Sequence, residues 1–238
     1  MSELKTNLEN MKILFLALSF CIFTRYSIGS PIENLKTNVE SIPTVKVLLL
    51  IPKGEVNLDG IEEKISIALK VTKEWYANQL GGRTFTISTS NIEKIFLQES
   101  VSQFANEGTR KSYSAEICYQ LAQKYSNVKT DDPKNIWLVF IAGGEFISHG
   151  GSGFACMSSD PFYAVRHRTN INTITGFQAI VAHELGHALG INHAEDWYNN
   201  RSLMGRWGGV LFPDKTFLLD SDKKILFTSP FIRKPESP

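Results

Sequence analysis

Residues 183–193 read His-Glu-Leu-Gly-His-Ala-Leu-Gly-Ile-Asn-His, the pattern H-E-x-x-H-x-x-G-x-x-H. Residues four apart lie on the same face of an α-helix, so His183 and His187 are expected to face one ion from consecutive turns. Glu184 is rotated by about 100° from His183. Its carboxylate is therefore expected beside the ion, where it can accept a proton from a metal-bound water.

A third histidine cannot reach the same ion by continuing the helix, and Gly190 solves this problem. Glycine adopts positive φ without strain and commonly ends helices. The chain can then turn back and bring His193 to the metal. Three protein ligands leave the fourth tetrahedral position for water, as in catalytic zinc sites. We therefore expect one catalytic zinc ion on His183, His187 and His193, with Glu184 as general base.

The start of this helix also has a sequence signature. Thr175 and Gln178 fit a capping box, which predicts that Thr175 is the N-cap. The side of the helix turned away from the metal is expected to be buried through its apolar residues, which are Ile180, Val181, Leu185, Ala188 and Leu189.

The zinc motif, followed by Met204 in Ser202-Leu203-Met204-Gly205, resembles that of the metzincin metallopeptidases, and within them the matrixin-type enzymes. The resemblance implies an α/β (α+β) catalytic domain with a twisted mixed sheet, packed helices and a zinc site on the active-site helix. It also implies that the three histidines bind zinc, that Glu184 is the general base, and that Met204 forms the Met-turn under the metal.

Two departures leave the metzincin subfamily open. Ala194 follows the third histidine, where matrixins usually have serine. No tyrosine follows Met204 at the spacing seen in astacin-like and serralysin-like enzymes.

Upstream of the motif, strand and helix patterns alternate, which favours a sheet covered by helices. The expected elements are a strand at 45–51, a helix from Asp59 to Gly81-Gly82, a strand at 83–89, a helix at 112–125, a strand at 136–142 and a last short helix within 220–231.

Residues 150–157, Gly-Gly-Ser-Gly-Phe-Ala-Cys-Met, resemble the glycine-rich stretch that leads into the metzincin edge strand. In the family, a peptide substrate pairs with that strand through backbone hydrogen bonds. The resemblance therefore places Gly153, Phe154 and Ala155 at the substrate. A surface loop is the alternative, because glycine-rich loops are common.

Arg206 and Trp207 follow Met204 closely. In the family, this segment walls the primed side of the substrate pocket. The resemblance therefore implies that Arg206 or Trp207 shapes the cleavage preference.

The N-terminal part contains an apolar run at 13–23, broken only by Ser19. A membrane span needs about 20 residues, so this run fits the apolar region of a secretory signal peptide. We expect a signal peptide at 1–29 (with Met11 as an alternative start), a short segment at 30–43 and the catalytic domain at 44–238. The protein is then secreted, or periplasmic in a Gram-negative cell. An uncleaved signal that anchors it to the membrane is the alternative.

Two cysteines, Cys118 and Cys156, follow the expected signal. They form a disulfide only if the fold brings them together, which the sequence does not show. A nucleophilic Cys156 is the alternative. His149, Asp160 and His167 offer a loose second zinc site, but without tight ligand spacing we expect solvent-facing histidines.

The chain of 238 residues has a net charge of +1, which gives no electrostatic case for a nucleic-acid partner. We expect a monomeric zinc endopeptidase that acts on polypeptide substrates and has no stable membrane span. One alternative is a catalytically silent peptide-binding protein, against which the presence of Glu184 argues. Another is a zinc amidase that acts on small or cell-wall amides.

Overall fold

The structure, a computed structural model, describes residues 42–55, 57–88, 92–101, 103, 113–143, 148–159, 173–206 and 208–234. The expected signal peptide, most of the segment 30–43, Asp160, His167 and Trp207 lie outside these residues. None of the described helices is both long and apolar enough to cross a membrane.

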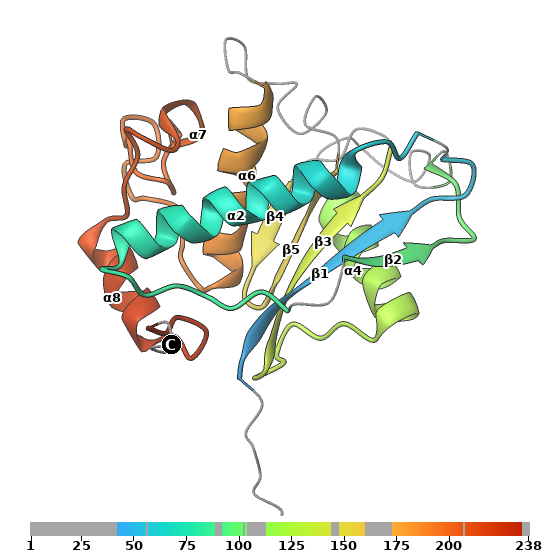
Figure 1. The fold of residues 1–238 in the computed structure, drawn as a ribbon, viewed down its shortest axis with the longest axis horizontal. Coiled ribbons are helices and arrows are strands. Elements are labelled where there is room, and N and C mark those ends of the chain that lie inside the picture. Colours follow the sequence, from blue (N-terminus) through green and yellow to red (C-terminus); the bar gives the residue numbers. More distant parts are fainter. Residues whose placement is uncertain are drawn as a thin grey trace, which may run out of the picture. The chain divides into compact units, whose positions relative to one another are not determined.

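Five strands form one mixed sheet in the order β2-β1-β3-β5-β4 (Figure 1). They are β1 (Thr44–Ile51), β2 (Glu93–Phe96), β3 (Asn135–Ile141), β4 (His149–Gly151) and β5 (Phe154–Ser158). The first four in this order pair in parallel, and β4 is antiparallel to β5. Within the described residues, β4 has no neighbour on its outer side, so it is a free edge of the sheet.

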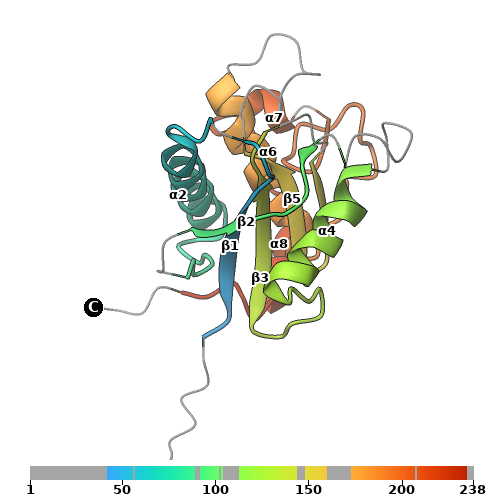
Figure 2. The same ribbon diagram turned by 90° about the vertical axis from the view of Figure 1, so that its right-hand side faces the viewer.

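Helices cover both faces of this sheet, as the view in Figure 2 shows for α2 (Ile61–Gln79) and α4 (Tyr113–Ser126). The long helix α6 (Thr173–Ala188) packs beside α2. Two further helices, α7 (Gly208–Leu211) and α8 (Asp220–Thr228), follow it in the chain. The last of these confirms the short helix expected within 220–231.

The apolar runs of β1 and β3 are explained by burial on both faces, since side chains alternate between the faces of a strand. One set faces α2 and α6 and consists of Val45, Val47, Leu49, Ile51, Ile136, Leu138 and Phe140. The other set faces α4 and consists of Leu48, Leu50, Trp137, Val139 and Ile141.

Helix α2 ends where the glycine pair predicts. Gly81 and Gly82 have φ of 63° and 86°, a left-handed conformation that glycine adopts without strain. The Gly82 N–H closes the turn on the Ala77 carbonyl at 2.8 Å.

The strand expected at 83–89 is wrong. The segment pairs with β1 at a single residue, Val45. The Val45 N–H donates to the Thr86 carbonyl, and the Ser88 N–H donates to the Val45 carbonyl. Beyond that point, β2 takes the same edge of β1, with Leu48 opposite Glu93. Phe85 is nevertheless buried.

The capping box expected at Thr175 is also wrong, because α6 already begins at Thr173. Thr175 and Gln178 therefore lie inside the helix. The first turns are held by packing onto the sheet, where Phe177 meets Phe140 of β3 at a ring-centroid distance of 6.2 Å. Such tertiary packing overrides local capping preference.

Cys118 of α4 and Cys156 of β5 form a disulfide between the two elements. Both residues are buried. This pairing excludes the nucleophilic role considered for Cys156.

Replacing both cysteines by alanine is expected to lower the free energy of unfolding by about 4 kcal/mol, because the bond closes a loop with a sequence separation of 38. Urea unfolding of the oxidised protein, the reduced protein and the double variant measures the effect. A loss below about 1 kcal/mol in the variant would contradict this expectation.

Candidate metal centre

The imidazoles of His183, His187 and His193 converge on one point. The Nε2 atom of His193 lies 3.3 Å from Nε2 of His183 and 3.0 Å from Nε2 of His187. In a tetrahedral zinc site with Zn–N distances of about 2.0–2.1 Å, ligand nitrogens lie about 3.3 Å apart. The three rings therefore fit a zinc ion, with one coordination position left open.

Gly190 makes this convergence possible by ending α6 in a Schellman motif. Its φ is 95°. The Gly190 N–H donates to the His187 carbonyl, and the Ile191 N–H donates to the Gly186 carbonyl, both at 2.9 Å. The chain then folds back under the helix and brings His193 to the two helical histidines, as expected from the sequence.

Backbone carbonyls orient the two helical histidines. The Nδ1 atom of His183 lies 2.8 Å from the Leu203 carbonyl oxygen, and Nδ1 of His187 lies 2.8 Å from that of Ile191. When Nδ1–H donates to a carbonyl, the ring presents the Nε2 lone pair to a metal. Leu203 is itself held, because its N–H donates to the Phe217 carbonyl at 2.8 Å.

Met204 lies directly below this helix and is fully buried. A Cβ atom added at Gly186 would come within 2.9 Å of the Met204 sulfur and 3.1 Å of the Tyr76 hydroxyl. Gly186 is therefore required for the close approach of Met204. The Met204 carbonyl also accepts a hydrogen bond from the Ala194 N–H at 3.1 Å, which ties the turn to the segment of the third histidine.

Glu184 lies between α6 and the edge strand β4, with 8% of its surface exposed. An added Cβ at Gly150 would meet the Glu184 carbonyl oxygen and the His187 Cβ, both at 2.6 Å, and Glu184 Oε2 at 3.0 Å. The lack of a side chain at Gly150 thus lets the free sheet edge lie against the helical turn that carries Glu184.

The electrostatics of the site favour neutral imidazoles. Burial lowers the pKa of both His187 and His193 below its usual value, and the nearby His149 lowers both further. Metal binding requires the deprotonated ring nitrogen. The two rings are thus able to bind a metal at neutral pH.

The residues that the sequence predicts at the substrate lie in different parts of the fold. Phe154 and Ala155 are buried in β5, whose backbone pairs with β3 on one side and β4 on the other. Gly153 lies in the turn before them, and its N–H donates to the Ala188 carbonyl at 2.9 Å. The free edge belongs to β4 instead. Arg206 is exposed, with its guanidinium 5.5 Å from the ring centroid of Tyr198.

Changing Gly150 to alanine is expected to lower the free energy of unfolding by about 1–3 kcal/mol, because the new methyl group overlaps the backbone of α6. Gly151→Ala is the matched control on the same strand, because nothing lies within 4 Å of its Cβ position. Thermal or urea unfolding of both variants provides the test. Equal stability of the two variants would contradict the close contact at Gly150.

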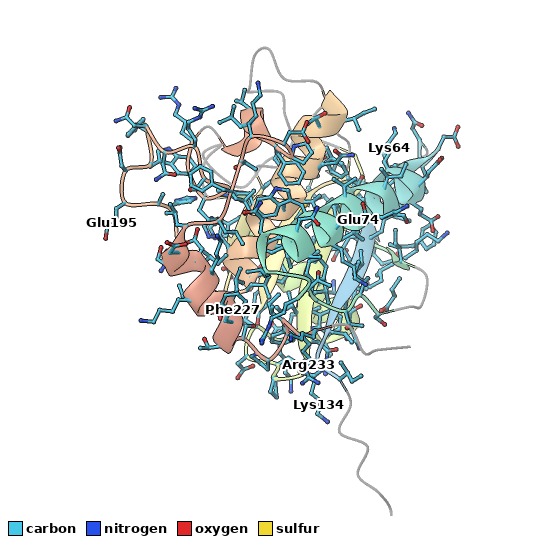
Figure 3. All side chains as sticks on the ribbon, turned by 60° about the vertical axis from the view of Figure 1, so that its left-hand side comes forward. Lys64, Glu74, Lys134, Glu195, Phe227 and Arg233 are labelled. Atoms are coloured by element: carbon cyan, nitrogen blue, oxygen red, sulfur yellow. A yellow bond between two sulfur atoms is a disulfide. The ribbon has the colours of Figure 1, made fainter. Side chains whose placement is uncertain are left out.

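Several features of the site carry no signal in the sequence. The orienting carbonyls of Leu203 and Ile191 are backbone atoms, which any residue would supply. Trp197 also approaches the triad, with its ring centroid 4.3 Å from that of His193. Figure 3 shows Glu195, a carboxylate close to His193 in sequence, pointing away from the protein. Only the three histidines gather as metal ligands among the described residues.

Comparison of the structure with known proteins shows similarity to OgpA from Akkermansia muciniphila. Wild-type OgpA superposes with a TM-score of 0.56 at 17% identity, over 87% of this chain and 66% of that chain. A catalytically inactive OgpA, in complex with an O-glycopeptide (glycodrosocin) substrate, gives 0.57 at 14% identity, over 91% and 65%. The two proteins share a fold.

This chain spans slightly less than two thirds of the length of the OgpA structures. A weaker similarity, with a TM-score of 0.43 at 15% identity, links 76% of this chain to 93% of archaemetzincin from Methanopyrus kandleri. No protein-family model matches the sequence, and no curated protein matches it. The expected fold class, an α/β domain with a mixed sheet and packed helices, is confirmed.

Proposed function

We propose that the protein is an exported zinc-dependent endopeptidase with Glu184 as its general base. The convergence of three Nε2 atoms at separations of 3.0 and 3.3 Å is the observation that carries the proposal. Glu184 is adjacent to His183 on the same helix, and its carboxylate lies at the edge strand rather than among the ligand atoms. The donor set of three neutral histidines with an open position is typical of catalytic zinc.

Zinc supplies, when bound, a Lewis acid that lowers the pKa of water and polarises a carbonyl group. Glu184 accepts the proton of the attacking water at its carboxylate. The water oxygen bonds to the scissile carbonyl carbon, and the C–N bond breaks as Glu184 delivers the proton to the leaving amine. His183 and His187 stay neutral and oriented, since the carbonyls of Leu203 and Ile191 accept their Nδ1 protons.

The free edge of β4 supports a polypeptide as the substrate. An extended peptide can add to an exposed strand through main-chain hydrogen bonds, which do not depend on sequence. Gly150 holds this edge against Glu184, so a peptide paired with β4 would run past the general base. Arg206 is proposed to contribute to the cleavage preference on the primed side.

The Cys118–Cys156 disulfide supports export, because disulfides persist mainly in oxidising compartments. Together with the apolar run at 13–23, it favours a secreted or periplasmic protein. We further propose that the protein binds a single catalytic zinc ion and acts as a monomer. The matrixin-type assignment is part of the same proposal.

The first test is hydrolysis of a denatured protein and of a mixed peptide library by the purified protein. We expect internal cleavage that 1,10-phenanthroline abolishes and added zinc restores. The non-chelating isomer 1,7-phenanthroline is the control. No cleavage by folded, zinc-loaded protein would contradict endopeptidase activity and favour a peptide-binding protein or an amidase.

The OgpA complex contains an O-glycopeptide. A second test therefore compares two forms of one peptide substrate. One peptide is tested with and without an O-linked glycan on a single threonine. Cleavage of both forms fits an endopeptidase that recognises the peptide backbone. Cleavage of the glycosylated form alone would show that the natural substrate carries a glycan.

A further inference from the structure

The third histidine differs from the other two in how its ring is held. His183 and His187 each have an Nδ1 atom 2.8 Å from a backbone carbonyl oxygen. Among the described residues, no hydrogen-bond partner is found for Nδ1 of His193. His193 also lies beyond the end of α6 and is exposed. Helical packing and a carbonyl acceptor therefore do not fix the rotamer of this ring.

The His193 ring instead contacts an aromatic side chain, that of Trp197. The ring centroids of His193 and Trp197 are 4.3 Å apart, with an angle of 46° between the rings. The same indole also reaches His183, edge to face, at 6.0 Å and 70°. Trp197 thus touches two of the three metal-binding side chains and is the one aromatic side chain outside the triad seen against them in the described residues.

The backbone that carries Trp197 is anchored by hydrogen bonds to successive carbonyls. The Trp197 carbonyl accepts a hydrogen bond from the Arg206 N–H at 2.8 Å. The preceding carbonyl, of Asp196, accepts from the Asn200 N–H at 2.9 Å. The anchored backbone keeps the base of the Trp197 side chain in place beside the His193 ring.

We propose that Trp197 is the positioning residue of the metal centre: its indole holds the His193 imidazole with Nε2 aimed at the metal. In zinc sites, outer groups usually orient ligand histidines through a hydrogen bond. Here, ring contact does so for the one histidine without such a bond. This inference rests on the proposed zinc site and adds to it a residue that the motif does not contain.

The test measures zinc affinity of the full chain by competition with a chromophoric chelator. Trp197→Ala is expected to weaken zinc binding by about 10-fold, within the range for loss of an outer-shell partner. Trp197→Phe keeps an aromatic ring and is expected to stay close to wild type. Tyr198→Ala is the matched control, because it removes an adjacent aromatic side chain that is 67% exposed.

Replacing zinc by Co²⁺ gives a measurement of ligand geometry. A general loss of stability does not change this measurement. The visible absorption bands of the Co²⁺ form are expected to shift in Trp197→Ala and to return in Trp197→Phe. Melting of the apoproteins checks that the variants fold. If Trp197→Ala does not fold, Trp197→Leu, which keeps apolar bulk without a ring, replaces it.

Zinc affinity and cobalt bands equal to wild type in the Ala or Leu variant would overturn the proposal. So would an equal loss in Tyr198→Ala, because the effect would then belong to the loop as a whole. A wild-type protein that binds no zinc would instead defeat the proposed function, so the two failures are distinguishable.

Discussion

Replacing Glu184 by glutamine is expected to lower kcat for peptide hydrolysis by about 10²- to 10⁴-fold, the usual contribution of a general base. The amide has almost the same shape as the carboxylate, so the contact with Gly150 persists, but it cannot accept the proton of the attacking water. Zinc content is expected to stay at the wild-type level, since Glu184 is not among the converging ligands.

Glu195→Gln is the matched control for this experiment. It makes the same chemical change at an exposed carboxylate that points away from the protein (Figure 3). We expect wild-type kcat for this variant, with both zinc contents measured on the same preparations. A Glu184→Gln enzyme that keeps wild-type turnover would show that another group acts as the base.

Replacing His193 by alanine is expected to weaken zinc binding by more than about 100-fold, which exceeds the usual cost of losing an outer-shell partner. The variant leaves only His183 and His187 as ligands, and two protein ligands are too few for a catalytic zinc site with tetrahedral coordination. Metal content after dialysis and the dissociation constant for Zn²⁺ measure the effect. Activity is expected to fall with zinc occupancy.

His149→Ala is the control for a histidine near the site but outside the triad. It lies near enough to lower the pKa of His187 and His193, yet its nitrogens do not converge with theirs. We expect this variant to keep zinc. Unchanged zinc content in His193→Ala, or an equal loss in His149→Ala, would mean that the ligand set differs from the one described.

The triad could be predicted from the sequence because its geometry is local. His183 and His187 face the same side of a helix by their spacing alone, and Gly190 dictates the turn that returns His193. The long helix α2 was predictable from its apolar periodicity, and the strands β1 and β3 from their apolar runs, because each pattern is contained within its own segment.

Features that depend on distant contacts could not be predicted. The segment 83–89 alternates like a strand, but β2 occupies the edge of β1 that it would need. Thr175 resembles an N-cap, but packing of Phe177 on Phe140 accompanies a helix that starts two residues earlier. The Cys118–Cys156 disulfide joins elements that are far apart in the chain.

The pairing of Leu203 with Phe217 bears on when the protein can acquire its metal. The carbonyl that orients His183 belongs to Leu203, whose N–H donates a hydrogen bond to the carbonyl of Phe217, a residue made later than every ligand. A nascent chain therefore carries all three histidines before the contact that holds the orienting carbonyl of His183 can form. We expect tight metal binding to begin only after Phe217 has been synthesised, and therefore after all three ligands have been made.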